Sequence, residues 1–232
     1  MISLAELFAS EETLHNMALT SGYNLLLATQ WQSKFAYQLR TYISYIHQMY
    51  QKVRFFSPLA SHDCGSVAEE YGSERSIYTR YVISSLFATG NTGLVQGNEF
   101  GTRKKIEFIG KPGIYSWNKD PDDSEFIRKI NRLLDEHMVF SEGANLRFID
   151  NNHQAILGAL RTDSNGGKYF LFVNLDIEKE QLLKIDLSNV FERSIENIEL
   201  ANLLGNGVEK FKPKEFELSI KPCDIRIYKL LE

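Results

Sequence analysis

Short apolar runs that alternate with amphipathic stretches of helical periodicity constrain the fold of this chain more than any other feature. The predicted strands are 2–5, 23–27, 53–56 and 94–96, and the predicted helices are 10–22, 32–51, 73–90 and 122–138. In the second helix the apolar positions, spaced mostly three or four apart, are Phe35, Leu39, Tyr42, Ile43 and Ile46. This spacing is typical of a helix with one buried face. Strands that alternate with helices form a parallel sheet covered by helices, so this part is predicted to be α/β.

The second part of the chain has a different pattern. The apolar runs 155–160 and 169–173 are predicted strands, and the Asp-Ser-Asn-Gly-Gly segment 163–167 between them has the composition of a hairpin turn. Further short apolar runs follow without long helices between them, which is typical of an antiparallel sandwich or barrel. We therefore expect two domains, an α/β domain over residues 1–140 and an all-β domain over residues 141–232.

The composition disfavours several classes of function. The chain has 26 Lys and Arg residues against 30 Asp and Glu residues, a formal net charge of −4. It has no excess of positive charge with which to hold nucleic acid or an anionic membrane surface, and no apolar run approaches the ~18 residues of a membrane-spanning helix. Cys64 and Cys223 lie far apart, which disfavours a disulfide scaffold. Because the N-terminus is unlike a signal peptide, we expect a cytoplasmic protein.

Neither a metal nor a cofactor is predicted. His15, His47, His137 and His153 do not have the spacing of metal ligands. The glycines of segment 90–93 do not follow a predicted strand, so they do not form a phosphate-binding loop.

Polar side chains follow three of the predicted parallel strands. Glu6 follows the first strand, His62 and Asp63 follow the third, and Asn98 and Glu99 follow the fourth. Functional side chains of such sheets lie at the carboxyl ends of the strands. Two carboxylates on this shared rim could act together, one protonated as a general acid and one ionised to stabilise positive charge. The structural alternative is that Glu6 caps the next helix and Asp63 begins a turn.

Several segments in sequence order carry a further signal. They are 3–8, 61–63, 94–101, 127–134, and 169–175 together with 222–228. In this order they resemble regions of the α-amylase family (glycoside hydrolase family 13): the strand that ends in the acid/base glutamate, the Asn-His-Asp region, the segment after the last barrel strand, the last barrel helix and the C-terminal sandwich. The resemblance implies the C-terminal half of a (β/α)8 barrel followed by an antiparallel β-sandwich.

The resemblance also implies a role for each matched residue. Glu6 would be the catalytic acid/base, and Asp63 would be the catalytic residue that stabilises the oxocarbenium-like transition state. His62 and Glu99 would bind substrate, an α-glucan or maltooligosaccharide. A retaining glycosidase needs two carboxyl groups that flank the scissile bond. Ser61 departs from the family pattern, which has asparagine at this position.

The nucleophile is missing from the matched segments. In this family it is an aspartate on the strand immediately before the acid/base strand, and no residue of this chain occupies that position. We therefore expect a fragment that is inactive alone and that works with a missing N-terminal barrel half. Both hydrolase and transferase activity fit the motifs.

Two other functions stay open at this point. One is a non-catalytic remnant of the same fold that binds glucans or another partner without hydrolysis. The other is an HD-type metal phosphohydrolase built on His62 and Asp63. That chemistry needs further His and Asp ligands on helices, whereas this pair follows a strand and a proline.

Overall fold

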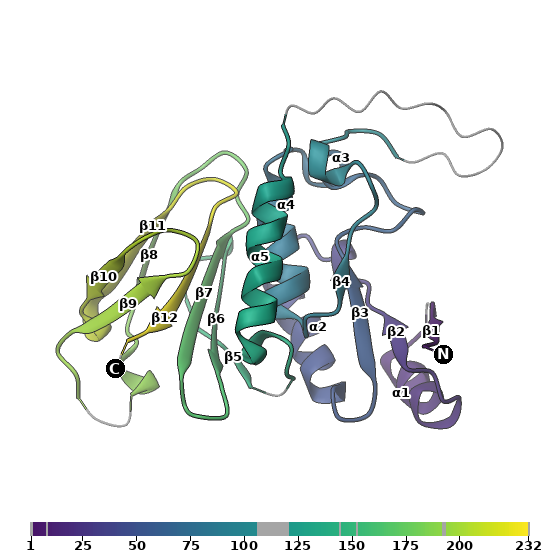
Figure 1. Ribbon diagram of the computed structural model, residues 1–232, viewed down its shortest axis with the longest axis horizontal. Coiled ribbons are helices and arrows are strands. Elements are labelled where there is room, and N and C mark those ends of the chain that lie inside the picture. Colours follow the sequence, from purple (N-terminus) through teal and green to yellow (C-terminus); the bar gives the residue numbers. More distant parts are fainter. Residues whose placement is uncertain are drawn as a thin grey trace.

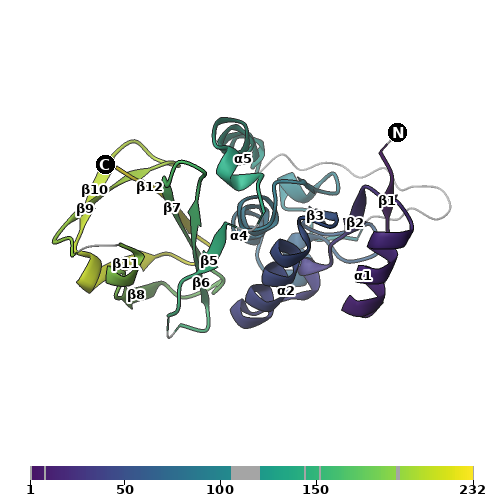
Figure 2. The same cartoon turned by 90° about the horizontal axis from the view of Figure 1, so that it is seen from below.

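The computed structural model describes residues 2–7, 9–105, 121–143, 145–151, 153–191 and 194–231. A parallel sheet lies at one end of the molecule, two antiparallel sheets lie at the other end, and helices lie between them (Figures 1 and 2). The parallel sheet comes from the first part of the chain and the antiparallel sheets come from the second. No helix in the described ranges is both long and apolar enough to cross a membrane.

The parallel sheet is built from short strands that pair in the order β1-β2-β3-β4, each parallel to its neighbour. The strands are β1 (Leu4–Ala5), β2 (Leu25–Leu27), β3 (Arg54–Pro58) and β4 (Thr92–Gly93). The helices are α1 (Glu11–Thr20), α2 (Ala36–Met49), α3 (Val67–Tyr71), α4 (Ser76–Val82) and α5 (Ser124–Glu136). Short helical turns are η1 (Gln30–Gln32), the π-helical η2 (Ile83–Phe87), η3 (Asn98–Phe100) and η4 (Met138–Phe140). The predicted α/β class of this part is confirmed.

The fourth strand lies earlier than the sequence predicts. It is formed by residues 92–93 and not by 94–96, because the amides of Ser57 and Leu59 donate to the carbonyl groups of Asn91 and Gly93. Leu94 and Val95 therefore follow the strand and lie beyond its carboxyl end. Helix α3 is a further element that the sequence pattern does not predict.

Helix α2 is shorter than predicted, and this moves Phe35 out of the core. The amides of Lys34 and Phe35 donate to Oε1 of Gln38 at 3.0 and 3.2 Å, which fixes the first turn. Phe35 occupies the N-cap position and is 58% exposed. The prediction that Phe35 lies on the buried face is wrong. The fully buried side chains of that face are Leu39, Ile43 and Ile46.

The second part of the chain forms a six-stranded sheet of order β10-β9-β12-β7-β6-β5 and a two-stranded sheet β11-β8, all antiparallel. The strands are β5 (Leu146–Phe148), β6 (Ile156–Thr162), β7 (Lys168–Asn174), β8 (Gln181–Ile185), β9 (Ile198–Asn202), β10 (Val208–Phe211), β11 (Phe216–Ile220) and β12 (Ile225–Leu230). Two short turns are η5 (Ser188–Val190) and η6 (Pro213–Glu215). The predicted hairpin is confirmed, since Asp163 Oδ1 accepts from the amides of Asn165 and Gly167. Strands β5 and β10 are not predicted by the sequence pattern.

The central strands of the six-stranded sheet are buried on both faces. Because side chains alternate along a strand, Leu157 and Leu171 pack against the helices, whereas Phe170 and Phe172 pack against the two-stranded sheet. One hydrophobic cluster thus joins α2, α4 and α5 to the six-stranded sheet. The division into domains 1–140 and 141–232 stays a prediction.

The end of turn η2 ties the helices to the six-stranded sheet. Nη1 of Arg161, on β6, donates to the carbonyl groups of Leu86 and Ala88 at 2.7 and 2.9 Å. Between them, the carbonyl of Phe87 accepts from Nε2 of His47, on α2, at 2.8 Å. The last carbonyl groups of a helix have no partner within the helix. Side chains from two other elements satisfy three successive ones here.

Acid is expected to destabilise the fold through His47. Burial, aided by the charge of Arg161, lowers the pKa of His47 from its ordinary 6.5 to about 4. The unfolded chain therefore takes up a proton before the folded chain does, so this stability is present above pH 6.5 and is lost as the pH falls toward 4. The loss reaches about 3 kcal/mol at pH 4.

Urea unfolding at pH 7 and at pH 4.5 checks this effect of His47. In His47→Gln, which keeps a donor for the carbonyl of Phe87, the fall in unfolding free energy between the two pH values should be smaller by about 2 kcal/mol. The carboxylates that also titrate in this range are common to both proteins and cancel in the comparison. An equal fall in both proteins contradicts the assignment.

Candidate functional site

A cavity of about 290 Å³ lies at the carboxyl ends of the parallel strands. Its lining residues are Leu4, Glu6, Leu27, Phe56, Pro58, Ala60, Ser61, His62, Leu94 and Val95. They come from β1, β2 and β3 and from the segments that follow β1, β3 and β4. The cavity therefore lies at the rim where the sequence places its candidate residues.

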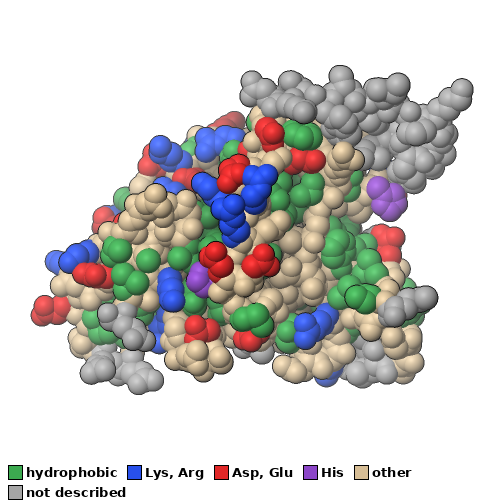
Figure 3. Space-filling view, in the orientation of Figure 1, with side chains coloured by type: hydrophobic (Ala, Val, Ile, Leu, Met, Phe, Trp, Pro, Cys, Tyr) green, Lys and Arg blue, Asp and Glu red, His purple; other side chains and the backbone are tan. Residues whose placement is uncertain are grey.

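The alternation of side chains along the parallel strands explains the apolar floor of this cavity. Leu26 and Phe55 pack toward α2 and are buried. Leu4, Leu27 and Phe56 line the cavity on the opposite face, where Leu4 is 46% exposed. Figure 3 shows hydrophobic side chains gathered at the parallel-sheet end of the molecule, with a histidine and acidic side chains bordering them. The floor is apolar and the rim is polar, a combination typical of ligand sites.

Glu6 is the first residue after β1, and its exposed side chain lines the cavity. The structural alternative for Glu6 was a cap on the next helix. Ser10 has that function instead, because its hydroxyl accepts from the amide of Thr13 at 3.3 Å. Glu6 is therefore positioned by the end of a strand and directed toward the rim.

His62 and Asp63 lie in a turn that Ser61 organises. The Ser61 hydroxyl accepts from the amide of Asp63 at 3.1 Å, and the Ser61 carbonyl accepts from the amide and thiol of Cys64. Nε2 of His62 lies 3.6 Å from Oδ2 of Asp63, and both side chains are about half exposed. His62 lines the cavity, and the carboxylate of Asp63 lies beside the His62 ring. Ser61, not Asp63, begins this turn.

Glu99 is not among the residues that line the cavity. Its carboxylate accepts from the amide of Gly97 at 2.7 Å, and its carbonyl accepts from the amide of Asp123 at 2.8 Å. The neighbouring Asn98 is buried and accepts from the amide of Val67, the first residue of α3, at 2.7 Å. These contacts hold the loop after β4 against α3. The substrate-binding role of Glu99 stays a prediction.

Lys105 contacts the turn that holds Asp63, whereas the sequence pattern of the basic segment 103–105 is typical of a solvated loop. Nζ of Lys105 donates to the carbonyl of Asp63 at 2.5 Å. Arg103, two residues earlier, pairs with Glu74 at 3.2 Å. The basic segment 103–105 was the signal available, but sequence alone does not show that it folds back onto the turn that holds Asp63.

The described part of the chain contains no cluster of side chains that could bind a metal ion. No group of three or more His, Cys, Asp or Glu side chains in these ranges could hold a metal ion. His62 and Asp63 lie on a loop after a strand, and not on the helices that an HD-type phosphohydrolase requires.

Similarity to known proteins is found at the level of structure. No model of a protein family matches the sequence, and no curated protein matches it. The fold is similar to that of the maltogenic α-amylase AmyB from Thermotoga neapolitana, with a TM-score of 0.74 and 16% identity over 100% of this chain and 55% of that one. It is also similar to an α-amylase from Geobacillus thermoleovorans in complex with acarbose, with a TM-score of 0.72 and 13% identity over 100% and 53%. A third similar structure is AmyP in complex with maltose, with a TM-score of 0.71 and 13% identity over 100% and 55%.

These similarities show the fold of the chain. It spans about half the length of the solved structures that it matches. The resemblance to the α-amylase family is thereby confirmed for the fold, on structures that share little sequence with this chain.

Proposed function

We propose that the cavity lined by Glu6 and His62 is the acid/base half of a glycoside hydrolase site that acts on α-glucans. One observation carries the proposal: Glu6 and His62, which follow the first and third parallel strands, line the same cavity, and Oδ2 of Asp63 lies 3.6 Å from Nε2 of His62. Retaining cleavage of a glycosidic bond requires an acid/base carboxyl group and a nucleophilic one, and Glu6 would supply the first. The similar structures named above support the substrate class, since two were solved with acarbose or maltose and one is maltogenic.

The chain in this proposal forms one half of the barrel and the sandwich that follows it. In the described residues β1 pairs only with β2, and β4 pairs only with β3. The face of the sheet opposite α2 carries the partly exposed Leu4, Leu27 and Phe56. Parallel sheets are normally buried on both faces, and unpaired edges favour aggregation. An N-terminal barrel half would cover this face, pair both edges and supply the nucleophile.

Each residue then has a defined chemical role. The nucleophilic carboxylate of the other half attacks the anomeric carbon while Glu6 donates its proton to the departing glycosidic oxygen. Glu6 next removes a proton from the water that breaks the covalent intermediate, which restores both groups. Ionised Asp63 stabilises the positive charge that develops on the sugar ring, and His62 donates to a sugar hydroxyl.

Maltotriose binding by the chain tests the proposal. The chain holds the proposed sugar-binding residues but not the nucleophile. We therefore expect saturable binding in isothermal titration calorimetry without turnover of maltotriose. His62→Ala and Asp63→Asn should each weaken the affinity about tenfold, since each removes a hydrogen bond to a charged or strongly polar group. Asp135→Asn, on the exposed side of α5, is the matched control and should bind as the unmodified chain does.

Two results would contradict this account. One is robust hydrolysis of maltotriose by the chain alone, which would show that no further half is needed. The other is an affinity for maltotriose that Glu6→Gln combined with Asp63→Asn leaves unchanged, which would favour a glucan-binding remnant that does not use these two residues.

A further inference from the structure

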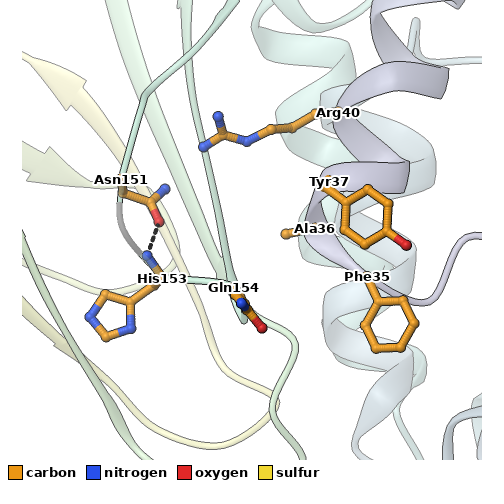
Figure 4. A pocket seen from close by; sticks show the side chains of 7 residues that line it. All are labelled: Phe35, Ala36, Tyr37, Arg40, Asn151, His153 and Gln154. Carbon is orange, nitrogen blue, oxygen red and sulfur yellow. Dashed lines mark hydrogen bonds between the residues drawn. The ribbon is translucent and has the colours of Figure 1, made fainter.

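A second cavity, of about 390 Å³, lies between the first turn of α2 and the segment that joins β5 to β6. Six of the side chains that line it are Phe35, Tyr37, Arg40, Asn151, His153 and Gln154 (Figure 4). None of these residues lines the cavity that contains Glu6 and His62. The function proposed above therefore leaves this second cavity without a role.

Phe35 and Tyr37 present two exposed aromatic rings with parallel faces, here called the aromatic platform. Their ring centroids lie 6.0 Å apart and their planes differ by 8°. Carbon atoms in face-to-face contact lie at ~3.5–4.0 Å, so parallel rings 6.0 Å apart are displaced sideways. Figure 4 shows the two rings next to each other with their faces turned the same way. Phe35 is 58% and Tyr37 is 67% exposed, so the platform is open to a ligand.

Polar side chains to one side of the aromatic platform are held in place. Arg40 donates to Oδ1 of Asp150 at 3.1 Å and to the carbonyl of Ile149 at 2.6 Å. Asn151 Oδ1 accepts from the amide of His153 at 3.0 Å, as the dashed line in Figure 4 marks. These contacts fix Arg40 and Asn151 before any ligand binds, which lowers the entropic cost of binding. The same side of the cavity also offers the imidazole of His153 and the amide of Gln154 to a ligand.

The charge balance of the second cavity favours a neutral ligand. Among the described residues that line it, Arg40 is the one Lys or Arg, and Arg40 is paired with the fully exposed Asp150. A phosphate or a nucleic acid requires an excess of positive charge, and the chain carries a formal net charge of −4. A ligand with apolar flat faces and polar edges matches both the parallel rings and the amide, imidazole and guanidinium groups.

We propose that this cavity is a second carbohydrate-binding site, which takes a linear neutral oligosaccharide. Two successive hexopyranose units lie with their C–H faces on Phe35 and Tyr37, and their hydroxyl groups bond to His153, Gln154 and Arg40. The site goes beyond the proposed hydrolase function, which uses only the first cavity. The choice of maltoheptaose as the probe rests on that function, so cellohexaose is used as a second probe.

Titration of the chain with each probe tests the second site. We expect Phe35→Ala combined with Tyr37→Ala to weaken the affinity for at least one probe by about tenfold or more, the effect of losing aromatic stacking. Both side chains are exposed, so the variant keeps its fold, which circular dichroism checks. Met138→Ala, which removes another exposed apolar side chain (66%), is the matched control and should leave the affinity unchanged.

The same titration in His62→Ala separates the two sites. Maltoheptaose binding should persist in His62→Ala and disappear when Phe35 and Tyr37 are also replaced. This result supports the second site whether or not the first cavity binds sugar. Equal affinity of the Phe35 and Tyr37 variant and the unmodified chain for both probes overturns the proposal. Self-association of the chain that is lost in this variant, without any effect on sugar binding, also overturns it, because the platform would then be a contact between copies.

Discussion

Replacing Arg161 with methionine is expected to lower the free energy of unfolding by about 3–5 kcal/mol. The side chain is 0% exposed, and besides the carbonyl groups of Leu86 and Ala88 it donates to the carbonyls of Phe140 and Glu142 and to Oδ1 of Asn145. Burial lowers the pKa of Arg161 to about 9, so the guanidinium still carries its charge at neutral pH. Methionine fills much of the same space and leaves these acceptors without donors. The free-energy cost of the unsatisfied acceptors exceeds the gain from no longer burying a charge.

Urea unfolding at pH 7 measures the effect of Arg161→Met. Arg147→Met is the matched control, because Arg147 is exposed on the neighbouring strand β5, and it should change stability by less than about 0.5 kcal/mol. A second readout is specific to the contact with η2. Removal of the Arg161 charge should raise the pKa of His47, which NMR titration of the imidazole reports. A loss below about 1 kcal/mol would show that the buried guanidinium does not hold the helices to the sheet.

Replacing Glu6 with glutamine is expected to lower kcat by about 10²–10⁴-fold in the polypeptide or complex that also supplies the nucleophile. An amide cannot give a proton to the departing glycosidic oxygen or take one from water, while its shape and its position after β1 are kept. The nucleophile and Asp63 are unchanged, so the affinity for substrate should change little. Glu12→Gln, an exposed carboxylate on α1, is the matched control and should leave kcat unchanged.

The leaving group distinguishes an acid catalyst from a residue that only shapes the cavity. Fluoride departs without a proton, so formation of the covalent intermediate from maltosyl fluoride should be nearly as fast in Glu6→Gln as in the unmodified enzyme. A loss of the same size for maltotriose and for maltosyl fluoride would assign Glu6 a structural role.

The rim that brings Glu6 and His62 together could be predicted from sequence. Apolar runs identify the first three parallel strands, and parallel strands end at the same edge of a sheet. The fourth strand escapes this reasoning because Thr92 and Gly93 form no apolar run, and their place is set by hydrogen bonds from β3. The position of β4 thus depends on its neighbour β3 and not on the residues of β4 itself, so the sequence pattern does not locate it.

Two other features depend on contacts between distant parts of the chain. Arg161 follows an apolar run, and a cation in this place indicates the end of a strand. Arg161 is nevertheless fully buried, because it donates to carbonyl groups in η2, directly after η2 and in η4. Phe35 fits the apolar spacing of α2, yet Gln38 closes the first turn and excludes Phe35 from the helix. Periodicity identifies a face, but the first residue of the helix decides which side chains belong to it.

Maltotriose titration followed by ¹⁵N NMR tests most directly whether the cavity between Glu6 and His62 is a sugar site. The account predicts saturable shifts of the amide signals of Glu6, Ser61, His62 and Asp63, and about tenfold more maltotriose for half-saturation of the Glu6, Ser61 and Asp63 signals in His62→Ala. Absence of shifts at these residues while other signals of the chain respond to the sugar would contradict it.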